Sequence, residues 1–300
     1  MNDFRDISCN ACGASDQTVL KVIDQYRAVR CNQCRLIFVN PMPFFAHTDF
    51  DSVSSDFYYT KLQKQVTDFE IARAEQEFAL LQSEWSGHLK TGGESRSLVD
   101  VGCGSGVFVK AAVANGWAAE GCDIDGSLTD FGHDQFGLRL KHADLVGSEY
   151  TDDAYDVVRF KFVLEHLPDP YDVLVEASRI LKPGGVVSIA VPNEAGLVNA
   201  ARLRLGQRCR DRWGTLIVPH HLHAYAPRTL RPLLQRAGFT NIRVKTATPT
   251  DLAYAPLQER AGWANKVAAP VWSAATLFGA GSILVAQAEK PTPPARRLAA

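Results

Sequence analysis

Four cysteines near the start of the chain form two matched pairs. Two residues separate Cys9 from Cys12 and Cys31 from Cys34, and 18 residues lie between the pairs. Two such knuckles predict a site in which four thiolates hold one zinc ion in tetrahedral geometry. The closed coordination sphere indicates a structural zinc, which replaces a core that so short a segment cannot build alone. Four unrelated thiols or a redox pair are the alternatives, but the spacing disfavours the first and neither pair opens a helix of a βαβ unit.

A glycine-rich segment follows the first apolar strand of the main part of the chain. Gly102, Gly104 and Gly106 alternate with other residues, and Asp100 precedes them. A dinucleotide-binding loop needs its third glycine where this chain has Val107, and a carboxylate is a poor neighbour for a pyrophosphate. The pattern therefore favours a cationic cofactor without phosphate, S-adenosylmethionine. A tight turn without a ligand is the alternative.

Two further acids follow the next two expected strands. Asp123 ends the second strand beside Ile124, and Asp144 follows the third strand beside Leu145. Because carboxyl ends of parallel strands meet at one edge of a sheet, we expect these residues to line the cofactor crevice. Asp123 is expected to bind the ribose hydroxyls and Asp144 the adenine amine. Phe162, after the fourth strand, is expected to pack on the cofactor.

Short apolar strands alternate with helices from Ser97 onward. Repeated βα units predict an α/β fold with a doubly wound, mostly parallel sheet covered by helices on both faces. The expected strands are Leu98–Val101, Trp117–Cys122, Leu138–His142, Tyr155–Phe160, Val186–Val191, Ile242–Thr246 and Ile283–Gln287. The expected helices are Gly106–Asn115, Ser127–Phe136, Tyr171–Leu181 and Pro227–Ala237.

Composition shifts divide the chain into four parts. We expect a zinc-binding knuckle over residues 1–45, a helical linker or lid over 46–95, a cofactor-binding domain over 96–290 and a disordered tail over 291–300. The linker helix is expected from about Asp56 to Leu89, and a basic lid is expected over 196–226.

Five segments resemble the class I S-adenosylmethionine-dependent methyltransferases: LVDVGCGSG, EGCDID, HADL, YDVVRFKFVLEHLPDP and RILKPGGVVSIAVPN. The resemblance runs from Ser97 to Asn193 and, less closely, to Lys290. The cysteine pairs and the segment PHHLHAYAPRTLRPLLQRAGF resemble a subgroup with an N-terminal zinc-binding domain. This resemblance implies a Rossmann-like, seven-stranded fold and S-adenosylmethionine as the methyl donor. Members of the subgroup methylate sugars, natural products and other small metabolites, so we expect a small anionic acceptor of the sugar, natural-product or quinone-like class.

Histidines are the candidate general bases for methyl transfer. Glu165 and His166 follow the fourth strand, where the resemblance places the reacting methyl group. His220, His221 and His223 cluster in the basic segment, and His221 completes the expected catalytic set. Imidazole is suited to this role because its pKa lies near neutrality. The alternative is that these side chains only cap a loop or orient the backbone.

A catalytic metal ion is disfavoured by the sequence. Quinone O-methyltransferases of similar fold carry E-x-x-E-H after the fourth strand and bind a divalent ion there. The matching stretch runs from Phe162 to His166, and phenylalanine replaces the first acid. Two ligands therefore remain where three are expected.

Charge is distributed unevenly, although the formal net charge is only −1. From Gly196 to Lys245 ten basic residues face one acid, so this stretch carries +9 and the remainder −10. Five arginines lie close together in it: Arg202, Arg204, Arg208, Arg210 and Arg212. Guanidinium groups match phosphate and carboxylate oxygens, which favours a phosphorylated or carboxylated small substrate. A solvated helix face is the alternative.

An RNA methyltransferase and a non-catalytic binding module are the alternatives to small-molecule methylation. An RNA methyltransferase would grip nucleic acid with its zinc ribbon, but the near-neutral chain and the three basic residues between Cys9 and Cys34 argue against nucleic acid. A non-catalytic S-adenosylmethionine-binding module is disfavoured by the intact glycine loop and its acids.

Cysteine usage and hydropathy bear on the location of the chain. The CxxC pairs indicate a reducing compartment and the N-terminus shows no apolar signal core, so we expect a cytoplasmic protein. The uncharged run Val267–Ala288 is long enough to span a bilayer, but Pro270 and two glycines divide it into a helix and a strand. We expect no membrane span, and residues 267–280 are left as an oligomer contact or a peripheral membrane surface. The oligomeric state is not predicted.

Overall fold

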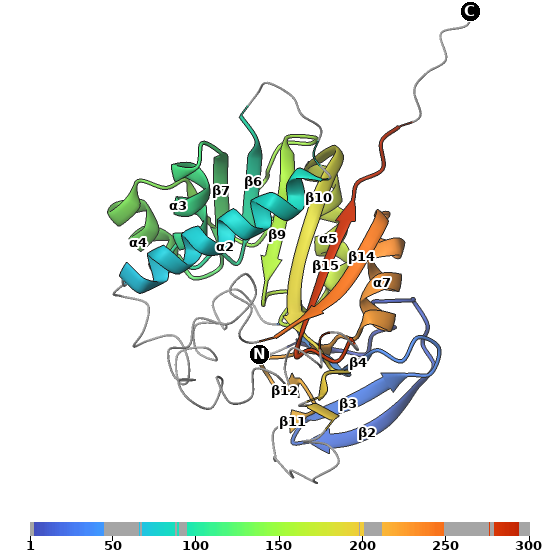
Figure 1. The fold of residues 1–300 in the computed structure, drawn as a ribbon. Coiled ribbons are helices and arrows are strands. Elements are labelled where there is room, and N and C mark those ends of the chain that lie inside the picture. The colour runs from blue at the N-terminus through green and yellow to red at the C-terminus, as the bar shows by residue number, and fades with distance from the viewer. Residues whose placement is uncertain are drawn as a thin grey trace, which may run out of the picture.

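The computed structural model describes residues 3–44, 66, 68–87, 89, 95–197, 199–200, 212–248, 276 and 279–293 (Figure 1). The first part of the expected linker helix, four of the five clustered arginines and most of the stretch 267–280 lie outside these residues. Of Arg212, only the backbone is described.

Seven strands form the central sheet in the order β14-β15-β10-β9-β6-β7-β8. The pairs formed by β6, β7, β8, β9 and β10 are parallel, whereas β15 runs antiparallel to both of its neighbours. The predicted doubly wound, mostly parallel sheet is therefore confirmed. The strands are β6 (Ser97–Val101), β7 (Ala118–Asp123), β8 (Leu140–His142), β9 (Tyr155–Lys161), β10 (Leu181–Pro192), β14 (Thr240–Ala247) and β15 (Ile283–Glu289).

Helices cover both faces of this sheet. Successive side chains of a strand point to opposite faces, so each strand contributes to two apolar clusters, one on each face. Leu98 and Val157 pack in the cluster that contains Phe78 of α2, whereas Val99 and Val158 pack in the other. Figure 1 shows α2 crossing in front of the sheet and α5 behind it. The helices are α2 (Asp68–Ser86), α3 (Val107–Ala114), α4 (Gly126–Phe136), α5 (Pro170–Ile180) and α7 (Pro227–Arg236).

Helix boundaries agree with the expected ones because capping residues define them. The Asp125 side chain accepts a hydrogen bond from the backbone of Ser127 at the start of α4, and Gly137 ends that helix at a φ of 65°. Pro170 occupies the first turn of α5. The strand β10 begins at Leu181, earlier than expected, and an irregularity in its pairing with β9 separates Leu181 from Val186.

Helix α2 is part of the main core. Phe78 and Trp85 are fully buried, and both pack edge-on or tilted against Trp117, which immediately precedes β7. Sequence analysis treated this segment as a linker or lid. The structure instead packs its described residues against the sheet, where α2 faces β9 and β10.

A second, four-stranded sheet contains most of the N-terminal segment. Its strands are β2 (Gln17–Ile23), β3 (Tyr26–Cys31), β4 (Ile37–Val39) and β13 (His223–Ala224), in the order β13-β4-β3-β2. The last of these strands belongs to the segment predicted as a basic lid, so the knuckle and the lid share one sheet. Short antiparallel pairs are formed by β1 (Asp3–Arg5) with β5 (Met42–Phe44), and by β11 (Arg212–Trp213) with β12 (Leu216–Ile217).

Among the described helices, none has the length and apolar character needed to cross a bilayer. The end of the uncharged run Val267–Ala288 forms most of β15, a central strand of the sheet, as expected.

Candidate active site

The glycine loop connects β6 to α3 at the carboxyl edge of the sheet. Gly102, Gly104 and Gly106 all have positive φ, at 69°, 56° and 75°. Glycine is required at Gly102 for a second reason, because a Cβ atom there would overlap the side chain of Val163. The glycine loop therefore lies directly against the loop that follows β9.

Asp123 joins the glycine loop to the end of β7. Its Oδ2 atom accepts a hydrogen bond from the backbone of Gly104 at 2.8 Å, and its Oδ1 atom accepts one from Asp125 at 2.9 Å. Burial raises the pKa of Asp123, although these backbone donors oppose the effect. Each carboxylate oxygen has a second lone pair, so the side chain retains acceptor capacity for ribose hydroxyls.

The other expected cofactor residues lie at the same edge. Leu145 is buried, and the half-buried Asp144 accepts a hydrogen bond from the backbone of Gly147 at 2.6 Å. The carbonyl of Ile124 accepts from Nε2 of His142 at 3.0 Å. These contacts order the turns after β7 and β8 beside the glycine loop.

β6 lies between β7 and β9, so the order of the chain reverses at this strand. Ligands of open α/β sheets bind outside the carboxyl ends of the strands at such a point. Phe162 is placed there, one residue after β9, with a φ of 55° that is rare for a non-glycine residue. Its backbone donates a hydrogen bond to Ala190 at 2.8 Å, which holds the chain in this conformation.

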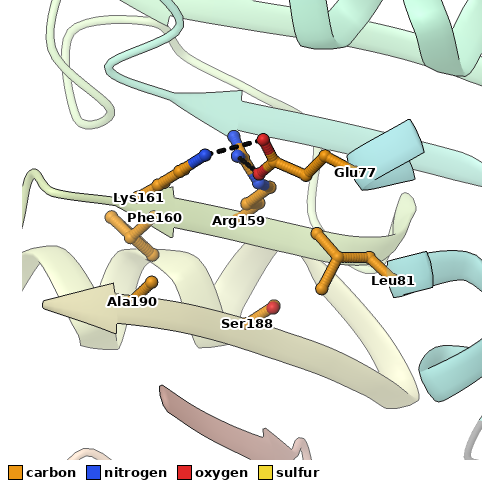
Figure 2. Close-up of a pocket in the computed structure, with 7 residues that line it drawn as sticks. All are labelled: Glu77, Leu81, Arg159, Phe160, Lys161, Ser188 and Ala190. Atoms are coloured by element: carbon orange, nitrogen blue, oxygen red, sulfur yellow. Dashed lines mark hydrogen bonds and ion pairs between the residues drawn. The ribbon is translucent and has the colours of Figure 1, made fainter. Parts of the chain in front are cut away.

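Asp100 has a partner that the sequence analysis missed. It is 2% exposed and pairs with Arg159, which lies opposite it in the neighbouring strand β9, with 2.5 Å between Oδ1 and Nη1. Arg159 also pairs with Glu77 of α2, and Nζ of Lys161 lies 2.6 Å from Oε2 of Glu77. Figure 2 shows Glu77 reaching from the helix toward both basic side chains. The expected role of Asp100 beside the cofactor stays a prediction.

These buried charges balance one another. Burial raises the pKa of Asp100, while the charge of Arg159 opposes that effect. Burial disfavours the Arg159 guanidinium, but the carboxylates of Asp100 and Glu77 raise its pKa. The signal in the sequence is the alternation of Arg159 and Lys161 within an apolar strand, which places both side chains on the face beneath α2. Together with Glu77 they line a small pocket whose other residues are Leu81, Phe160, Ser188 and Ala190 (Figure 2).

The expected catalytic residues do come together. The nearest oxygen of Glu165 lies 3.9 Å from Nε2 of His166, and the rings of His166 and His221 lie 4.7 Å apart and nearly perpendicular. Glu165 is 1% exposed, and neither of its carboxylate oxygens has a hydrogen-bond partner among the described residues. Burial raises the pKa of Glu165 to about 8. Burial, together with His221, lowers the pKa of His166 to about 3.

Backbone carbonyls orient both imidazoles. Nδ1 of His166 donates to the carbonyl of His220 at 2.8 Å, and Nδ1 of His221 donates to the carbonyl of Thr215 at 2.9 Å. A carbonyl only accepts, so the proton of each neutral ring resides on Nδ1 and the lone pair on Nε2. The three residues Glu165, His166 and His221 are called the acceptor cluster below.

His223 does not belong to the acceptor cluster. It is buried in β13, where its ring stacks on Phe38 and on Tyr225, with 14° between the planes in both cases. Its Nε2 atom lies 3.3 Å from Nδ2 of Asn10, between the first two cysteines. His223 therefore connects the N-terminal sheet to the loop after β9.

The four cysteines lie together as predicted. The Sγ atoms of Cys9 and Cys34 are 3.4 Å apart, those of Cys12 and Cys31 are 3.6 Å apart, and all four lie within 4.8 Å of one another. Sulfur ligands of tetrahedral zinc are separated by roughly 3.8 Å, so the cluster fits a structural zinc ion. Asn10 extends from this cluster and donates to the carbonyl of Pro168 at 3.3 Å, close to the acceptor cluster.

Comparisons with known proteins identify the family of this chain. Residues 73–244, more than half of the chain, match the family described as "Methyltransferase domain". A solved S-adenosylmethionine-dependent methyltransferase from Archaeoglobus fulgidus superposes with a TM-score of 0.49 at 19% identity, covering 72% of this chain and 94% of that one.

Curated relatives match shorter stretches. A ubiquinone biosynthesis O-methyltransferase from Caulobacter vibrioides is 29% identical over 61% of this chain and 73% of that protein. The corresponding protein of Methylococcus capsulatus is 32% identical over 33% of this chain and 45% of that protein. The 27-O-demethylrifamycin SV methyltransferase of Amycolatopsis mediterranei is 32% identical over 36% and 44%. In the last two cases the chain spans less than half of the relative's length. Because the family match extends over most of the chain, this chain belongs to the methyltransferase domain family.

Proposed function

We propose that the protein transfers the methyl group of S-adenosylmethionine to a small molecule bound at the acceptor cluster. The observation that carries this proposal is the contact between Gly102 and Val163, which brings the glycine loop against the loop that presents the cluster. Glu165 and His166 follow Val163 by two and three residues. A cofactor on the glycine loop and an acceptor at the cluster would therefore meet in one crevice.

Residues at the carboxyl edge of the sheet would hold the cofactor. Gly102, Gly104 and Gly106 give it close access to the backbone, and Asp123 accepts from its ribose. Asp144 and the neighbouring Leu145 would border the adenine, while Ile124 and Phe162 would contact the apolar parts of the cofactor. We assign Asp100 a positioning role, because its ion pair with Arg159 anchors the end of β6 beneath α2. The bound cofactor supplies a methyl group already activated on a sulfonium centre.

Methyl transfer to a hydroxyl needs removal of one proton. When bound, S-adenosylmethionine would supply its methyl group to the acceptor oxygen and depart as S-adenosylhomocysteine, and residues of this chain would take up the hydroxyl proton. We assign the proton to Nε2 of His166 or of His221, since the Nδ1 hydrogen bonds leave the ring lone pair at that atom. The relatives named O-methyltransferases support an oxygen acceptor. The clustered arginines favour one that carries phosphate or carboxylate.

The N-terminal segment packs against the loop that presents the acceptor cluster. Its sheet incorporates β13 and its Asn10 contacts the loop after β9, so the segment packs beside the crevice. We propose that a zinc ion on Cys9, Cys12, Cys31 and Cys34 stabilises this arrangement. The cytoplasmic location stays a prediction.

Calorimetry and an activity screen test the proposal in sequence. The full chain should bind S-adenosylmethionine, and Asp123→Ala should weaken binding at least tenfold, whereas the surface variant Asp134→Ala should not. A screen of phenolic, sugar and quinol acceptors with labelled donor should then yield a methylated product. His166→Ala and His221→Ala should lower kcat while cofactor affinity stays unchanged. A chain that binds no S-adenosylmethionine would refute the proposal.

A further inference from the structure

We infer that Glu165, His166 and His221 form a site for a divalent transition-metal ion, separate from the four cysteines. One ligand atom from each residue lies within 4.8 Å of the other two. Two histidines and one carboxylate are the protein ligands of several zinc enzymes and of non-haem iron enzymes. Three protein ligands leave at least one coordination position for another molecule.

The orientation of the two imidazoles is the first argument. Metal-binding histidines almost always donate their second ring N–H to a carbonyl or carboxylate, which aims the other nitrogen at the metal. Both rings show this arrangement, since Nδ1 of His166 donates to His220 and Nδ1 of His221 donates to Thr215. The Nε2 atom of each ring carries the lone pair that a metal ion needs.

The carboxylate of Glu165 is the second, independent argument. The side chain is 1% exposed, and neither oxygen has a hydrogen-bond partner among the described residues. No Lys or Arg of the described part of the chain forms an ion pair with it, and the nearest imidazole nitrogen stands 3.9 Å away. Burial of an unpaired carboxylate is costly unless a cation compensates it. A metal ion held with the two imidazoles would supply that charge.

The fold provides the third ligand that the sequence lacks. Phe162 occupies the position of the first acid in the E-x-x-E-H pattern, which left only Glu165 and His166. His221 comes from a distant segment, and the backbone of Leu222, the next residue, donates to the carbonyl of Glu165 at 2.7 Å. That hydrogen bond holds the two segments in register, so His221 reaches the other two ligands.

The binding of a metal ion does not depend on the proposed function. Only the catalytic role of that ion rests on it. An acceptor hydroxyl bound at the open position would lose its proton to water more readily, because a coordinated cation lowers the pKa of an oxygen ligand. The histidines would then be ligands and the metal ion would replace them in activating the acceptor. Metal binding itself is measurable without any acceptor.

Titration of Mn²⁺ into the zinc-loaded full chain tests the site, because Mn²⁺ prefers oxygen and nitrogen ligands to thiolates. Calorimetry and the electron paramagnetic resonance of bound Mn²⁺ should show one site per chain. His221→Ala and Glu165→Gln should each weaken binding at least tenfold. His220→Ala removes a neighbouring imidazole but keeps the carbonyl that orients His166, so its affinity should match the wild type.

Circular dichroism of each variant establishes that it folds, and Glu165→Gln keeps the shape of the side chain if His221→Ala does not fold. The inference is wrong if wild-type protein binds no Mn²⁺, or if both ligand variants bind it as tightly as His220→Ala. Binding of S-adenosylmethionine, measured in the same samples, separates the outcomes. If the wild-type protein binds S-adenosylmethionine but no Mn²⁺, only the metal site is overturned. If it binds neither of them, the proposed function is overturned as well.

Discussion

Asp100 and Arg159 occupy paired positions on adjacent parallel strands and form a buried ion pair beneath α2. The pair connects the end of β6 to the helix, because Glu77 of α2 also pairs with Arg159.

Arg159→Met should destabilise the protein by about 3–5 kcal/mol, because it leaves the carboxylate of Asp100 buried without a counter-charge. Urea unfolding followed by circular dichroism measures the change. Arg139→Met is the matched control, since Arg139 is 69% exposed and stands 3.5 Å from Glu120. That variant should differ from wild type by less than about 1 kcal/mol. Equal effects of the two substitutions would show that the buried network does not stabilise the fold.

Gly102→Ala should weaken S-adenosylmethionine binding at least tenfold in calorimetry. The new methyl group overlaps Val163, so the loop after β9 must move away from the glycine loop. Gly116→Ala controls for backbone strain, because Gly116 has a φ of 81° but no neighbour near its Cβ position. The double variant Gly102→Ala, Val163→Ala should recover part of the affinity. A double variant no better than Gly102→Ala would argue against the steric explanation.

Asp156 should contribute to stability in a pH-dependent way. Burial opposes its ionisation, but hydrogen bonds from Lys182 and Ser97 outweigh that effect and lower its pKa. A carboxylate with a depressed folded-state pKa stabilises the protein above its unfolded pKa, and that stability is lost as the pH falls through the folded value. Asp156→Asn should therefore be less stable near neutrality, with a difference that shrinks as the pH approaches 3. Urea unfolding across this range measures it, and a difference that is constant with pH would contradict the prediction.

Cys31→Ser should lower the zinc content by one ion per chain and destabilise the N-terminal sheet, because Cys31 is both a predicted ligand and the last residue of β3. Mass spectrometry for metals and thermal unfolding provide the measurements. Cys122→Ala alters a buried cysteine outside the cluster and should keep the zinc. Retention of zinc by Cys31→Ser would refute the four-cysteine site.

Local patterns in the sequence were sufficient for the central sheet and for the position of Asp123 at its carboxyl edge. Asp123 follows a strand in the sequence, and the fold places it at the carboxyl edge because parallel strands end together. Cys9 and Cys12 lie on one knuckle for a similar reason, since two intervening residues determine their separation. In each case the relevant distance along the chain is short.

Contacts between distant segments were not predictable in this way. Arg159 was read only as part of a strand, because its partners Asp100 and Glu77 are identified by strand register and by the packing of α2. His221 was proposed as a base, but its position beside Glu165 depends on the path of the chain from β12 to β13. The pairing of β13 with β4 has no local signal, because two residues are too few to show a strand period.

The pairing of β13 with β4 also has a consequence for the evolution of the enzyme. Under the proposed function, β6, β7 and β8 would hold the methyl donor, whereas the N-terminal sheet and the His220–Ala224 segment lie beside the acceptor cluster. Substitutions in this second unit would change which molecule is methylated without altering the residues that hold the methyl donor. If the proposed function holds, recombination at the boundary between the two units would introduce new acceptors while the strands that hold the donor stay unchanged.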